Sequence, residues 1–68
     1  MRNPGRIDKI CDEFNLLWHR VPDWRLTQLM INAFTAYENK TGDVPFYAED
    51  EEFIEFMKKY ISEIVEHE

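Results

Sequence analysis

The chain has 68 residues, of which 44% are hydrophobic and 15% aromatic, so we expect one domain over residues 1–68 with its own hydrophobic core. Its formal net charge is −6, because residues 1–25 carry five basic and four acidic side chains whereas residues 26–68 carry three basic and ten acidic ones. An acidic surface repels phosphate groups, which argues against nucleic acid and against an anionic membrane surface as partners.

Cysteine usage and hydropathy indicate the compartment. Cys11 is the only cysteine, so neither an internal disulfide nor a cysteine metal cage is expected. The residues after Met1 do not form the apolar run of a signal peptide, and no stretch is apolar over the length needed to cross a bilayer. These features predict a soluble protein of the reducing cytoplasm.

The first predicted helix covers residues 5–20, after a tail at residues 1–5 that we expect to be mobile. Asn3 is a candidate cap for this helix, and Pro22 ends it because proline disfavours helical geometry in the residue before it. Apolar side chains recur at spacings of three and four, which predicts one buried face. This face is formed by Ile7, Ile10, Cys11, Phe14, Leu17 and Trp18, with Leu16 outside it.

The second predicted helix covers residues 24–40, with Asp23 as its N-cap and Gly42 as the residue that ends it in a left-handed conformation. We expect Gln28 and Asn32, one helical turn apart, to bond to each other or to cap a neighbouring backbone group. The predicted buried face consists of Leu26, Leu29, Met30, Ala33, Phe34 and Tyr37.

The third predicted helix covers residues 49–66 and follows an extended loop in which we expect some of Val44, Phe46 and Tyr47 to pack over the helices. Four acidic residues at its start, Glu49 to Glu52, interact favourably with the helix dipole. Its predicted buried face consists of Phe53, Phe56, Met57, Tyr60, Ile61 and Ile64, flanked by Ile54 and Val65. The three amphipathic segments together predict an all-α fold, a compact three-helix domain.

Residues that often carry chemistry are poorly placed for it. His19 and His67 have no second histidine, cysteine or carboxylate at metal-ligand spacing, and Cys11 has no base on its helical face. The run Glu49 to Glu52 lacks the pattern and the glycine of a calcium loop. We therefore predict no catalytic residue, no metal and no cofactor, and a protein that is not an enzyme.

The tight corner before the second helix invites comparison with a helix-turn-helix. The exposed face of that helix carries Gln28 and Asn32, which can read adenine in principle. Only Arg20 and Arg25 are available near this corner for phosphate contacts, and the overall charge is unfavourable. DNA reading is therefore the weaker interpretation.

The chain has more large apolar side chains than three single-face helices need. Beyond Leu16 and Ile54, the surplus comprises Trp24, Ile31, Phe46, Tyr47 and Phe56. These residues either close the core from several sides or form an exposed surface for another protein or for a second copy of the chain. They are the candidate partner surface.

Three segments carry a resemblance. Trp18 precedes Pro22-Asp23 and Arg25-Leu26, Gln28-Leu29 precedes Asn32, and Pro45-Phe46-Tyr47 precedes Glu49-Asp50-Glu51. Over nearly the whole chain this pattern resembles a family of short bacterial and phage-borne proteins of unknown function, from which the chain departs by the insertion of Val44 between Asp43 and Pro45. The resemblance implies an all-helical domain of bacterial or phage origin and brings no catalytic or binding residue with it.

Two functions remain open at this point. The first is a non-enzymatic cytoplasmic accessory protein that binds another protein, which the surplus aromatic side chains favour. The alternative is an acidic phage-type inhibitor, a DNA mimic whose carboxylates replace phosphates on a nucleic-acid enzyme. The excess of acids over residues 43–68 favours this alternative.

Overall fold

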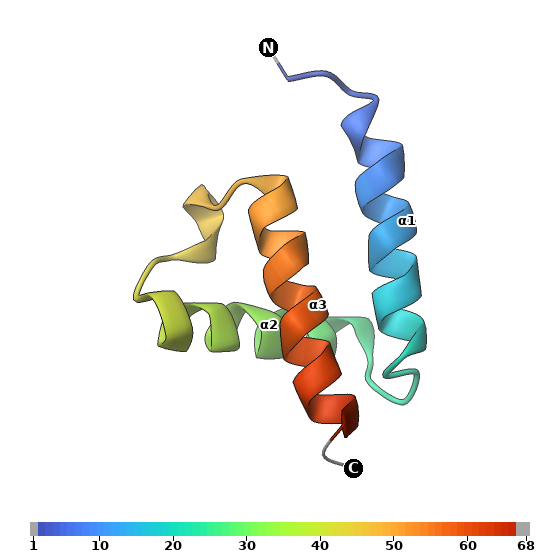
Figure 1. Ribbon diagram of the computed structural model, residues 1–68, viewed down its shortest axis with the longest axis vertical. Helices are drawn as coiled ribbons and strands as arrows, with labels where there is room; N and C mark the ends of the chain where they lie inside the picture. Colours follow the sequence, from blue (N-terminus) through green and yellow to red (C-terminus); the bar gives the residue numbers. More distant parts are fainter. Residues whose placement is uncertain (1, 67–68) are drawn as a thin grey trace.

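The computed structural model describes residues 2–66, so His67 lies outside the described residues. It contains helix α1 (Arg6–His19), helix α2 (Leu26–Thr41), the short 3-10 turn η1 (Pro45–Tyr47) and helix α3 (Asp50–Glu66). Helices α1 and α3 lie side by side and run in the same direction, and α2 crosses behind α3 (Figure 1). The predicted all-α three-helix fold is confirmed, and each predicted helix end lies within two residues of the observed one.

The core lies where the three helices meet. Leu29, Ala33 and Ile61 are completely buried, and Met57 is nearly so. The other buried members of this cluster are Leu17, Val21 and Ile54, and partly buried side chains surround them. Because α3 supplies three of the seven buried residues and lies between the other helices, it is the central element of the domain.

Polar contacts follow the seam between α1 and α3 from one end to the other. Arg6 Nε donates to Asp50 Oδ2 at 2.7 Å, Lys58 Nζ donates to Glu13 Oε1 at 3.2 Å, and an Arg20 guanidinium nitrogen donates to Ser62 Oγ at 3.0 Å. The partners advance together along both helices, as two parallel helices require. Hydrogen bonds from Lys58 to Glu55 and to Glu13 raise the pKa of the Lys58 ammonium group.

Aromatic side chains fill the seam between α2 and α3. The ring of Tyr37 lies edge-on to Phe56, with centroids 5.3 Å apart, and the rings of Phe56 and Tyr60 are stacked at 6.1 Å. Phe53 contacts Tyr37 and Phe34 at 5.5 and 5.6 Å. Partial burial in this cluster raises the pKa of the Tyr60 hydroxyl, because a low-polarity environment disfavours the phenolate.

The corner between α1 and α2 differs from the prediction. Asp23 is not the N-cap, because α2 begins at Leu26 and Arg25 occupies the cap position. The backbone N–H of Arg25 instead donates to Gln28 Oε1 at 2.8 Å, which confirms that Gln28 caps a backbone group. The indole Nε1–H of Trp18 donates to the carbonyl of Trp24 at 2.9 Å, which ties the end of α1 to the residue before the cap of α2.

Several burial predictions are wrong: Ile7 and Leu26, which were assigned to buried faces, are 51% and 48% exposed, and three further cases follow. Cys11 is exposed, because one step along a helix is a rotation of about 100° and Cys11 falls outside the line of Ile10 and Leu17 that faces α3. Ile54 belongs to the centre of the core, not to its flank. Val44, Phe46 and Tyr47 are 53%, 83% and 80% exposed, because the loop packs through its partly buried residues Pro45 and Ala48 instead.

The residues predicted to end α2 and to cap α1, Gly42 and Asn3, both take part in turns. Gly42 ends α2 with φ +77°, as predicted, and its N–H donates to the carbonyl of Glu38. Before α1, the Asn3 side chain accepts from the N–H of Gly5 at 2.9 Å, so Asn3 caps a turn and not the helix itself. Arg2 pairs with Glu49 at 3.2 Å; the mobility of this tail stays a prediction.

Candidate functional site

The four elements enclose an open hollow of about 320 Å³, which we call the apolar hollow. Ten of its eleven lining side chains are apolar, and they come from every element of the fold. The lining residues are Ile10 and Phe14 from α1, Met30 and Phe34 from α2, Pro45, Phe46 and Ala48 in or beside η1, and Asp50, Phe53, Ile54 and Met57 from α3.

The floor of the apolar hollow is buried and its rim is exposed. Ile54 and Met57 belong to the buried core, and Phe34 rests on Phe53 with ring centroids 5.6 Å apart. At the rim, Phe34 is 38% exposed and Phe46 is 83% exposed. Covering an apolar side chain of this size gains on the order of 1.5–3 kcal/mol, so this rim offers free energy to any apolar group that binds over it.

The rim of the apolar hollow continues along the η1 turn into an acidic edge. Phe46 and Tyr47 lie edge-on to each other with ring centroids 5.0 Å apart, and Tyr47 is 80% exposed. Asp43 and Glu52 line a second hollow of about 380 Å³ together with Tyr47. Over residues 2–66 neither carboxylate has a basic nitrogen within 4.0 Å, whereas Asp50 is held by Arg6.

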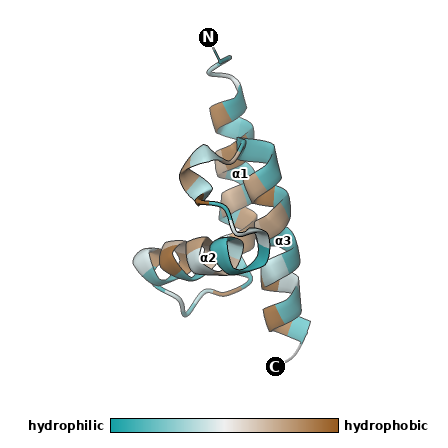
Figure 2. Cartoon of the chain, turned by 90° about the vertical axis from the view of Figure 1, so that its left-hand side faces the viewer, coloured by the Kyte–Doolittle hydropathy of each residue, from teal (hydrophilic) through white to brown (hydrophobic). Residues whose placement is uncertain are grey.

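Figure 2 views the molecule from the side on which α2 and η1 lie, and hydrophobic residues appear on both elements. The first three turns of α2 explain this, because no residue from Leu26 to Tyr37 carries a charge. Ile31 is 63% exposed on this helix. A solvent-exposed surface without charged groups binds water weakly, so it loses little hydration when a partner covers it.

The predicted partner-surface residues do not all lie together. Phe46 lines the apolar hollow and Tyr47 adjoins it, whereas Ile31 is exposed on α2. Trp24 is partly buried against the core at the corner, and Phe56 is partly buried in the aromatic seam between α2 and α3.

The sequence did not predict that two side chains of α2 line the apolar hollow. Met30 and Phe34 were assigned to the predicted buried face of the second helix, yet the structure leaves them partly open at the hollow. The uncharged stretch from Leu26 to Tyr37 was the signal in the sequence that could have indicated this.

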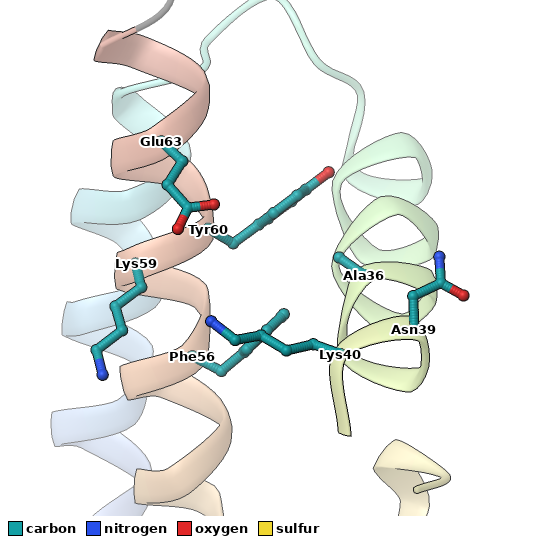
Figure 3. A pocket seen from close by; sticks show the side chains of 7 residues that line it. All are labelled: Ala36, Asn39, Lys40, Phe56, Lys59, Tyr60 and Glu63. Carbon is teal, nitrogen blue, oxygen red and sulfur yellow. The ribbon is translucent and has the colours of Figure 1, made fainter. Parts of the chain in front are cut away.

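A further hollow of about 350 Å³ lies between α2 and α3 and is shown in Figure 3. Its walls include Phe56 and Tyr60, and the Tyr60 side chain extends towards α2. Lys59 is directed to the other side of α3, and Glu63 adds a negative charge to the site. Partial burial raises the pKa of the Tyr60 hydroxyl, which favours its neutral form further.

Groups that could support catalysis are separated in the described part of the chain. No three histidine, cysteine, aspartate or glutamate side chains within residues 2–66 are grouped so that they could hold a metal ion. His19 Nδ1 lies 2.8 Å from the carbonyl oxygen of Asn15 in its own helix, and Cys11 is exposed. That the protein uses no cofactor and is not an enzyme stays a prediction.

Two further observations concern the surroundings of the protein. Among residues 2–66, none of the helices combines the length and the apolar character that crossing a bilayer requires. Comparison of the chain with protein-family models, with curated proteins and with solved structures finds no match, so the resemblance to short bacterial and phage-borne proteins stays a prediction.

Proposed function

We propose that this protein is a small, non-enzymatic accessory module of the cytoplasm that binds another protein through the apolar hollow. The observation that carries the proposal is the 83% exposed Phe46 ring at the rim of a hollow with ten apolar lining side chains. Monomeric soluble proteins seldom expose contiguous apolar surface without a binding role. A shallow site whose one ionisable lining group, Asp50, is already bonded to Arg6 suits recognition better than chemical catalysis.

The composition of the walls supports a protein partner. Aromatic and methionine side chains are enriched at protein interfaces, and four phenylalanines and two methionines line the hollow. Met30, which is partly exposed, has a flexible, polarisable side chain that can adapt to the shape of an inserted group. The floor formed by Ile54 and Met57 is already buried in the core, which limits the ordering cost on binding.

The DNA-mimic alternative receives less support. An acidic strip that replaces phosphates must present free negative charge, yet Glu49 pairs with Arg2 and Asp50 pairs with Arg6 at the start of α3. Further along the same helix, Lys58 bonds both Glu55 and Glu13. Basic side chains therefore pair three of the eight acidic residues over residues 43–66, which interrupts the continuous strip of free charge that this function would need.

Affinity capture from a lysate of the organism that encodes the protein tests the proposal. We expect the unchanged protein to retain a specific partner and the Phe46→Ser variant to lose it, because serine removes the ring at the rim. Leu16→Ser is the matched control, since Leu16 is 70% exposed on α1 and does not line the hollow.

Retention of the same partner by Phe46→Ser, or its loss from both variants, would place the binding surface elsewhere. Recovery of no protein, together with turnover of a small molecule by the purified chain, would contradict the proposal altogether.

A further inference from the structure

The charge beside the apolar hollow, in the neighbouring hollow next to the η1 turn, indicates what kind of partner the apolar hollow takes. Asp43 and Glu52 lie beside the exposed ring of Tyr47, and no basic side chain within residues 2–66 pairs with either. A cation brought to this edge would meet two carboxylates and the face of an aromatic ring, and each of these attracts it. An anionic partner would be repelled by the same groups.

The backbone of the partner is also restricted. The walls of the hollow come from helices, whose main-chain groups are bonded internally, and the described residues contain no strand edge. An extended peptide would find no main-chain partners there and would bury unsatisfied N–H and C=O groups. A helix bonds its own backbone and presents only side chains, so it meets this restriction.

We propose that the apolar hollow binds a basic amphipathic helix of a partner protein. This inference rests on the proposed function and deepens it. Apolar residues on one face of that helix cover Phe34 and Phe46, and lysine or arginine on the adjoining face reaches Asp43, Glu52 and the ring of Tyr47. Two copies of this chain suit each other less well, because each carries a formal charge of −6.

A synthetic peptide of about 18 residues tests the inference, since this length supports helix formation. Leucines at i, i+3, i+4 and i+7 form one face and lysines fill the rest. The comparison peptides carry glutamate in place of every lysine, or the same leucines and lysines in shuffled order. Titration calorimetry with the full chain gives Kd, and we expect the lysine peptide to bind most tightly.

Matched charge variants locate the site. The double variant Asp43→Asn with Glu52→Gln should weaken binding of the lysine peptide about tenfold, the combined effect expected for a few exposed charge contacts. Glu63→Gln with Glu66→Gln removes the same charge near the other end of α3 and should leave Kd within about twofold. Phe46→Ser should weaken binding of the same peptide at least as much as the acidic double variant.

Each other outcome has a distinct meaning. Equal binding of the lysine and glutamate peptides, both weakened by Phe46→Ser, would overturn the basic partner and leave the proposed function standing. If both double variants weakened binding of the lysine peptide equally, the attraction would come from net charge alone, and the inference would be overturned. Binding of neither peptide by a monomer would count against both proposals. A dimer that Phe46→Ser converts to a monomer would show that a second copy covers the hollow, which also overturns the inference.

Discussion

Replacing Leu29 by alanine tests the central packing claim. Leu29 is completely buried in the core cluster, so truncation leaves a cavity among residues that cannot move far. Substitutions of this kind cost about 2–5 kcal/mol. A domain of this size has a total unfolding free energy of about 3–10 kcal/mol. The change should therefore remove a large share of the stability.

Leu16→Ala provides the matched control, because the same atoms are removed from a side chain that is 70% exposed on α1. Its effect should stay within about 0.5 kcal/mol. Urea unfolding followed by circular dichroism measures both variants. With a slope of about 1 kcal/mol per molar urea, a loss of about 3 kcal/mol lowers the midpoint by about 3 M. Similar midpoints for the two variants would refute the assignment of Leu29 to the core and of Leu16 to the surface.

Three further predictions concern the turns and the aromatic seam. Gly42→Ala should cost about 1 kcal/mol in thermal unfolding, because φ is +77° there and an added Cβ would meet no other atom within 4 Å; an unchanged midpoint would exclude backbone strain at this position. Trp18→Phe should cost about 1–2 kcal/mol, since it removes the 2.9 Å bond to the carbonyl of Trp24; an unchanged unfolding midpoint would mean that this bond does not hold the corner. Because the pKa of Tyr60 is raised in the folded state, its contribution to the free energy of unfolding is complete below the ordinary tyrosine pKa of about 10 and is lost as pH rises through the folded-state value. Tyr60→Phe should therefore flatten the alkaline fall in stability, measured by urea unfolding at increasing pH. An identical fall in both proteins would contradict this.

The helices were predictable because their signals are local. Spacings of three and four, a proline at the corner and a glycine after the second helix define segments that need no knowledge of tertiary structure. Gly42 adopts the left-handed conformation that its position after the second helix suggests, because glycine has no Cβ atom to make that conformation unfavourable.

The buried faces were less predictable, because they depend on which helix packs against which. Helix α3 has α1 on one side and α2 on the other, so its buried line runs through Ile54, Met57 and Ile61, with Phe53 and Phe56 on the flank that faces the aromatic seam. The buried face predicted from the sequence was centred on the large aromatic side chains, and it therefore placed Ile54 on the flank.

The apolar hollow could not be predicted from any one segment. Its lining side chains come from residues as far apart in the chain as Ile10 and Met57, and only the crossing of α2 and the return through η1 bring them together. Of the predicted partner surface, Phe46 and Tyr47 adjoin the hollow because their loop packs through Pro45 and Ala48 and leaves both rings outside.

The parallel arrangement of α1 and α3 has a mechanical consequence. Figure 1 places the start of α1 and the end of α3 at opposite ends of the long axis of the molecule. Tension applied between these two points would slide one helix along the other, and the contacts Arg6–Asp50, Glu13–Lys58 and Arg20–Ser62 would bear the load simultaneously. An antiparallel pair pulled from neighbouring ends would instead open one contact at a time.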